Sequence, residues 1–320
     1  MERGRPRHSI IPPAAPALLV LLGCVVLLWA GCSYPQPSKQ FNELLSRYPP
    51  TEDPLQVQLL TAGSAEAVPL SSRGRPVTFI VHPAYSLFFR KATRSFYTEA
   101  KFDLLKHQLE SEARFITEIG NSGNLLILVL PGNYEQDSVA PAAYTRYLNS
   151  AVGGSPSVYA VYSETSSSGA LPVEAVVMLH GFLKSLRPPS VLVGGGFIGR
   201  CQREFYNQVI TYVGEASAFI VPEISTVSPD DISDGEAQTM LEGILRGDYG
   251  PIDRFIDKRN KGRVRVTMLP GELDQREEQT DGAPVRPEGD GGPVLGTVPM
   301  NEQALVPAGE SGREKEPAAH

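Results

Sequence analysis

The stretch "VLVGGGFIGRC", residues 191–201, carries the clearest indication of the fold. An apolar triplet runs into three glycines, and a segment with helical spacing begins at Cys201. A short apolar run that passes through glycines into a helix is typical of a strand-to-helix connection in an α/β sheet. The segments on either side show whether this interpretation extends along the chain.

Similar apolar runs alternate with amphipathic segments on both sides of this stretch. We expect strands at residues 77–82, 124–130, 157–163, 190–195, 218–223 and 263–269. We expect helices at residues 99–119, 140–152, 173–186, 201–213 and 235–245. Ser233 and Glu236 form the pattern of a capping box before the last helix. Continuously apolar strands alternating with helices predict a three-layer α/β/α domain at 74–270, with a doubly wound, mostly parallel sheet of about five or six strands.

The first 31 residues have the organisation of a signal peptide. Three arginines precede the apolar run "APALLVLLGCVVLLWA". The following Ala30-Gly31-Cys32 resembles the end of a bacterial lipobox, which implies a lipid on Cys32. Cys24 fits the same pattern, but cleavage there would leave apolar residues exposed, and an uncleaved anchor is the other alternative. Ser33 resembles the outer-membrane sorting signal, so we expect an envelope lipoprotein that faces the periplasm or the surface and contacts the membrane through its N-terminal lipid.

The two ends of the chain differ in composition from its centre. Prolines interrupt residues 32–73, and residues 271–320 are rich in proline, glycine and acidic side chains. We therefore expect a flexible tether before the domain and a disordered tail after it. The formal net charge of -7 excludes a basic surface for nucleic acid. Once Cys24 and Cys32 are assigned to the signal and the lipid, Cys201 has no disulfide partner.

The glycines of the opening stretch match a dinucleotide fingerprint. Gly194, Gly196 and Gly199 satisfy G-x-G-x-x-G, and Glu223 follows at the distance of a ribose-binding carboxylate. The string resembles the second nucleotide motif of pyridine-nucleotide disulfide oxidoreductases. However, three strand-helix units precede it and no second fingerprint exists for a flavin. We expect no cofactor, and dinucleotide binding is kept as a third alternative.

The same stretch is similar to the V-V-V-x-G-V-x-x-x-x-C pattern of the isochorismatase-like cysteine hydrolases. "FIVHPAYSLFF" is similar to the first strand and following loop of that family. The resemblance implies a nucleophile at Cys201 that cleaves an amide through a thioester, with an aspartate and a lysine as partners. Here His82 stands at the aspartate position, and Ser163 or Glu164 stands at the lysine position. Lys184 lies in an expected helix and does not replace the lysine.

Cys201 has three open interpretations. It shares a helical face with Phe205 and Val209, which is typical of core packing. It could instead be a nucleophile paired with His82, its pKa lowered by the helix N-terminus, or it could line a binding site. The missing aspartate and lysine favour a non-catalytic module that binds an envelope protein or a small molecule. The alternative is a cysteine hydrolase of a small amide or ester.

We expect no metal site. His107 and His180 have no partner at the spacing of metal ligands. The acidic cluster Asp230, Asp231 and Asp234 lacks the alternation of a calcium loop, and helix capping explains it.

Overall fold

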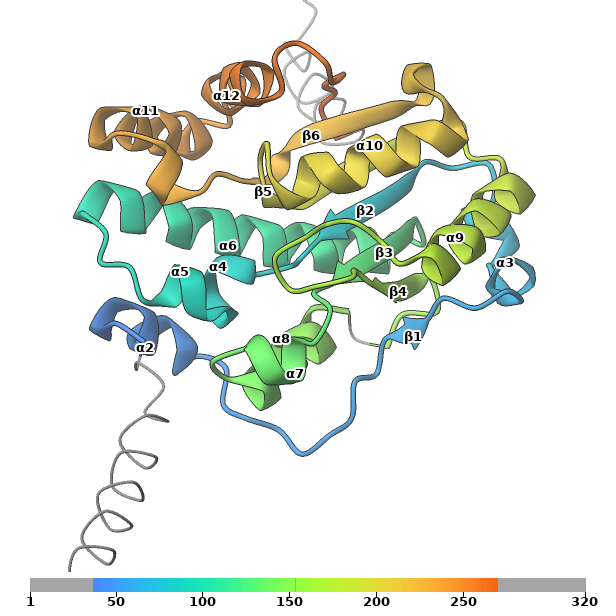
Figure 1. Ribbon diagram of the computed structural model, residues 1–320, viewed down its shortest axis with the longest axis horizontal. Coiled ribbons are helices and arrows are strands. Elements are labelled where there is room, and N and C mark those ends of the chain that lie inside the picture. Colours follow the sequence, from blue (N-terminus) through green and yellow to red (C-terminus); the bar gives the residue numbers. More distant parts are fainter. Residues whose placement is uncertain (1–36, 153, 270–320) are drawn as a thin grey trace, which may run out of the picture. The chain divides into compact units, whose positions relative to one another are not determined.

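The computed structural model describes residues 37–152 and 154–269 (Figure 1). Within these residues, six parallel strands form one sheet with helices packed on both faces. The predicted three-layer α/β/α class is confirmed. The signal peptide, Cys32 and the tail at 271–320 lie outside the described residues, so the expectations for them stay predictions.

The sheet has the order β1-β4-β3-β2-β5-β6, and every neighbouring pair is parallel. The strands are β1 (Gln58–Leu59), β2 (Val77–Val81), β3 (Leu125–Leu130), β4 (Val158–Tyr162), β5 (Val191–Phe197) and β6 (Ala218–Thr226). From β2 the chain adds β3 and β4 on one side, and then crosses to place β5 on the other side of β2. The carboxyl ends of β2 and β5 are therefore the topological switch point of the sheet.

The central strands are apolar on both faces because each face has its own core. In β2, Val77, Phe79 and Val81 belong to the core that includes residues of helices α9 (Val173–Leu186) and α10 (Cys201–Val213). Ile80, between two of them, belongs to the core that includes residues of helices α6 (Glu99–Asn121) and α8 (Pro141–Val152). Successive side chains of a strand point to opposite faces, so a strand covered on both sides is continuously apolar.

The helices that follow the strands supply the two outer layers. The longer helices are α6 (Glu99–Asn121), α8 (Pro141–Val152), α9 (Val173–Leu186), α10 (Cys201–Val213), α11 (Asp234–Leu245) and α12 (Gly250–Asn260). The short α-helices are α2 (Lys39–Leu45), α3 (Ser64–Ala67), α4 (Tyr85–Phe88), α5 (Arg90–Thr93) and α7 (Tyr134–Asp137). The 3-10 turns are η1 (Leu70–Ser72), η2 (Glu215–Ser217) and η3 (Pro229–Asp231). Both halves of the predicted capping box are present, since the Ser233 side chain accepts from the Glu236 backbone and the Glu236 side chain accepts from the Ser233 backbone.

The expectation of a flexible tether is wrong for residues 37–73. Strand β1 pairs with β4 and completes the sheet. In α2, the Phe41 side chain is fully buried and packs edge-on against Tyr97 and Phe102. The prolines in this segment shape its connections without removing it from the fold.

Two further differences concern the C-terminal side of the domain. The expected strand at 263–269 is reduced to a single parallel bridge between Val266 and Ile220. Helix α12 was not expected, although Ile252, Phe255 and Ile256 have helical spacing and are buried.

Candidate functional site

His82 and Ser163 lie together at the carboxyl edge of the sheet. His82 follows β2 directly, and Ser163 follows β4. The His82 Nε2 atom is 2.9 Å from the Ser163 hydroxyl oxygen, and both side chains are buried. The predicted partner of Cys201, His82, is therefore bonded to Ser163 instead, one of the two residues expected at the lysine position of the resemblance.

The Ser163 hydroxyl has several hydrogen-bond partners besides His82. It lies within donating distance of the Thr165 carbonyl at 2.7 Å and of the Leu130 carbonyl at 3.3 Å, and it accepts from the Gly132 backbone N–H at 3.1 Å. The direction of its bond with His82 depends on the tautomer of the ring, and a proton on Nε2 would be donated to Ser163. Burial lowers the pKa of His82 to about 3, so the ring is neutral at pH 7. Its Nδ1 atom is buried without a hydrogen-bond partner among the described residues.

Cys201 is the first residue of α10, and its side chain is only 4 % exposed. Its Sγ atom accepts from the Phe197 backbone N–H at 3.3 Å. A helix N-terminus favours a thiolate, but here burial has the larger effect and raises the pKa of the Cys201 thiol. The nucleophile interpretation of Cys201 requires a lowered pKa, and burial shifts it in the opposite direction. In the described part of the chain, no hydrogen bond joins Cys201 to His82.

Aromatic rings pack together at the carboxyl ends of β2 and β5. Tyr85 stacks on Phe89 with ring centroids 4.7 Å apart and meets Phe197 edge-on at 5.5 Å. Burial raises the pKa of Tyr85 to about 12, so its hydroxyl is neutral. The Arg200 guanidinium lies 5.8 Å from the centre of the Phe197 ring and pairs with Asp231 at 2.6 Å. The rings in this part of the edge are buried against one another, and the positive charge beside them is already paired.

Glu112 was missed by the sequence analysis. It lies in the middle of α6 and is only 2 % exposed. Its Oε1 atom accepts from the Ala84 backbone N–H at 2.6 Å and from the Tyr147 hydroxyl at 3.2 Å. Burial raises the pKa of Glu112 to about 7. The sequence pattern does indicate that Glu112 is buried, because it lies at helical spacing between the core residues Leu109 and Ile116.

The carboxyl group of Glu112 fixes the loop that follows β2. Ala84 has φ 50°, and His82 in the same loop has φ 49°. Residues other than glycine rarely adopt this left-handed conformation, which costs roughly 1–2 kcal/mol for each. The hydrogen bond from the Ala84 backbone N–H to Glu112 stabilises this conformation and so sets the position of Tyr85 at the carboxyl edge of the sheet.

The glycine stretch does not have the geometry of a phosphate cradle. Gly194, Gly195 and Gly196 lie within β5, where the pairing with β6 is irregular. The Phe197 N–H donates to Cys201, and the Ile198 N–H donates to the Thr226 carbonyl. The backbone donors that would face a phosphate are thus used within the protein.

Glu223, the expected ribose-binding carboxylate, also has a structural role. One Glu223 oxygen accepts from the Leu269 backbone N–H at 2.8 Å, which ties the end of the described chain to β6. The sharp turn instead begins at Gly199, where φ is 74° and an added Cβ would meet Arg259. Neither Glu223 nor these glycines supports the dinucleotide alternative.

The remaining candidates lie apart from the edge or have structural partners. Lys184 is exposed near the end of α9, and His180 stacks on Tyr212. Asp231 holds both Arg200 and Arg259 in ion pairs, and Asp234 accepts from the Thr98 hydroxyl. Within residues 37–152 and 154–269, no three acidic, histidine or cysteine side chains are grouped so that they could hold a metal ion. Over the same residues, no helix has the length and apolar character needed to cross a membrane.

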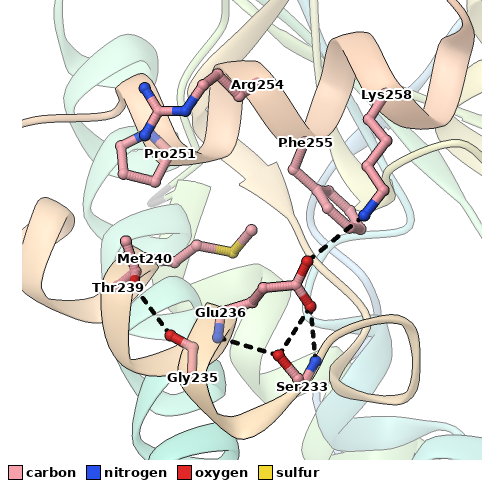
Figure 2. Close-up of a pocket in the computed structure, with 9 residues that line it drawn as sticks. All are labelled: Ser233, Gly235, Glu236, Thr239, Met240, Pro251, Arg254, Phe255 and Lys258. Carbon is pink, nitrogen blue, oxygen red and sulfur yellow. Dashed lines mark hydrogen bonds and ion pairs between the residues drawn. The ribbon is translucent and has the colours of Figure 1, made fainter.

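An open groove of about 370 Å³ lies between α11 and α12 (Figure 2). Met240, Pro251 and Phe255 form its apolar part. Its carboxylate, Glu236, bonds to Ser233 as part of the helix cap and pairs with Lys258 at 3.5 Å (Figure 2). The charged groups that meet in this groove stabilise the two helices, so it is a weaker site candidate than the sheet edge.

The fold and the edge together define an α/β protein with buried aromatic and polar side chains gathered at the switch point of a parallel sheet. Comparison with protein-family models and with curated proteins finds no match to this chain. The functional conclusion therefore depends on the chemistry of the site.

Proposed function

We propose that residues 37–269 form a non-catalytic, isochorismatase-like binding module, which a lipid on Cys32 attaches to a membrane of the bacterial envelope. The hydrogen bond between His82 and Ser163 carries this proposal. The resemblance implies a catalytic aspartate at the position of His82 and a catalytic lysine at the position of Ser163 or Glu164.

The chemistry of amide cleavage explains why this pair matters. A cysteine hydrolase needs a thiolate, a base that accepts its proton and a group that stabilises the developing negative charge. Burial keeps Cys201 in the thiol form, and His82 is neutral with its Nε2 atom hydrogen-bonded to Ser163. Arg200, the cation next to Cys201 in the chain, is paired with Asp231. The site therefore lacks the charges of the reaction but keeps a cluster of aromatic rings beside it.

The aromatic residues at this edge would favour a small planar ligand. Tyr85 is only 9 % exposed and Phe197 only 7 % exposed, so a ligand would have to replace one of their ring contacts, and stacked or edge-on ring pairs contribute about 0.5–1.5 kcal/mol each. Thermal shift measurements with a panel of small aromatic amides and carboxylates test this proposal. A ligand should raise the melting temperature of the parent chain and of Cys201→Ala equally, and should not raise that of Tyr85→Ala above its own unliganded value. Turnover of an amide or ester that Cys201→Ala abolishes would instead establish a cysteine hydrolase.

The membrane part of the proposal has a separate test. Metabolic labelling with a radioactive fatty acid should mark the parent chain and Cys24→Ala, and should not mark Cys32→Ala. Labelling that survives Cys32→Ala would contradict the assignment of the anchor.

A further inference from the structure

Helix α9 presents apolar side chains to solvent as well as to the core. Its inner face buries Leu179, Phe182 and Leu183. On the outer face Val173 is 72 % exposed and Val177 is 66 % exposed. These two valines are four residues apart and so lie on one stripe of the helix. Gly181, one turn further on, is also exposed, and an added Cβ there would meet no atom within 4 Å.

A further exposed apolar side chain lies close to this helix in the fold. Helix α9 packs against α3 (Figure 1), and Leu70, in the turn that follows α3, is 82 % exposed. Exposed apolar side chains that gather on one face of a folded domain are typical of an interaction site.

The charges at the two ends of this stripe are opposite. Glu174 lies in the first turn of α9 and Lys184 in its last turn, and both are exposed. Neither makes an ion pair with another described residue. A face with a carboxylate at one end, an ammonium at the other and a valine and a glycine between them is complementary to itself when two copies run antiparallel.

We propose that the outer face of α9 forms a two-fold symmetric interface with α9 of a second copy of this chain. With the axis level with Leu179, Glu174 lies opposite Lys184 of the partner subunit. Val177 then faces Gly181 of the partner subunit, where the missing side chain leaves room for it. Antiparallel pairing also places the positive end of each helix dipole beside the negative end of the other.

Disulfide cross-linking tests the register of this interface. In a full-length chain with Cys24 and Cys32 replaced by serine, the double variant Glu174→Cys/Lys184→Cys should form a covalent dimer under mild oxidation. Within one helix the two positions are about 15 Å apart, too far for an internal disulfide. Each single variant should form no covalent dimer, and a mixture of the two single variants should cross-link. Equal cross-linking by the single variants, or no cross-linking by the mixture, would overturn the proposal.

Substitutions on the stripe test whether the interface forms without a covalent bond. Val177→Glu should convert the dimer to a monomer in native mass spectrometry of the detergent-solubilised chain. Leu245→Glu, at a side chain of α11 that is 63 % exposed, is the matched control and should leave the dimer intact. Glu174→Lys should weaken the dimer, and adding Lys184→Glu should restore it. A chain that is monomeric without any substitution, or a dimer that Val177→Glu leaves intact, would refute the interface.

Discussion

Two buried ionisable residues give the folded state opposite responses to pH. His82 has its pKa lowered to about 3, so between pH 6.5 and 3 the unfolded chain binds a proton that the folded chain does not. Stability therefore falls as the pH drops through this range. Glu112 has its pKa raised from 4.5 to about 7, so between pH 7 and 4.5 the folded chain binds the extra proton. Its contribution to stability rises as the pH drops, and the two slopes oppose each other between pH 4.5 and 6.5.

Glu112→Gln separates these two contributions. The glutamine oxygen can still accept from the Ala84 N–H, but the variant no longer holds a buried charge. We expect its free energy of unfolding to exceed that of the parent by roughly 3 kcal/mol at pH 8, and the difference to vanish below pH 4.5. Urea unfolding from pH 4 to 8 measures both curves. Glu52→Gln, at an exposed position, is the control and should leave the curve unchanged. Parallel curves for Glu112→Gln and the parent would contradict the pKa shift of Glu112.

The glycines of β5 are required by close backbone contact. Gly195 has φ 68°, and an added Cβ would collide with the Val81 backbone on the neighbouring strand. Gly195→Ala should lower the free energy of unfolding by roughly 3 kcal/mol, from left-handed strain and overpacking together. Gly235→Ala is the matched control, because its Cβ meets nothing within 4 Å and its φ is not positive. It should be neutral or stabilising by about 0.5 kcal/mol in urea unfolding. Equal effects of the two substitutions would rule out the close contact.

At the scale of elements, the segment before β2 is structural. Phe41→Ala removes a fully buried ring from α2 and should cost about 3–5 kcal/mol. Phe96→Ala removes a ring that is 81 % exposed and should change stability by less than about 0.5 kcal/mol. Thermal and urea unfolding of both variants distinguish an integral α2 from a tether. Similar, small effects of the two substitutions would favour the tether.

The elements that the sequence predicted well are those with a long, regular apolar pattern. Helices α9 and α10 begin and end at the expected residues, and β2, β3 and β4 agree to within one residue at each end. Strand β1 was missed because it has two residues and leaves both of them exposed, so it has no apolar pattern. The fourth strand was expected to end at Gly195, whereas β5 continues to Phe197. Gly194 and Gly195 allow the close approach of Ile224 and Val81, residues that are distant in the sequence.

At the scale of the whole molecule, the sheet edge could be predicted but its chemistry could not. The order of strands and helices along the chain places His82, Ser163 and Cys201 at the carboxyl edge before any side chain is seen. Whether His82 contacts Cys201 or Ser163 depends on the conformation of the loops, and His82 itself has a left-handed backbone conformation. The direction of the Cys201 pKa depends on burial, which sequence spacing does not determine. An exposed thiol at the same helix N-terminus would have a lowered pKa and would be reactive.

The central claim is that Cys201 is a buried packing residue of a binding module. The most direct test is the rate of iodoacetamide alkylation against pH for the folded chain with Cys24 and Cys32 replaced by serine. We predict little reaction below pH 8 and full reaction once urea unfolds the protein, because burial keeps Cys201 in the thiol form. Rapid alkylation of the folded protein at pH 6–7 would reveal an accessible thiolate, and would contradict the account in favour of a cysteine hydrolase.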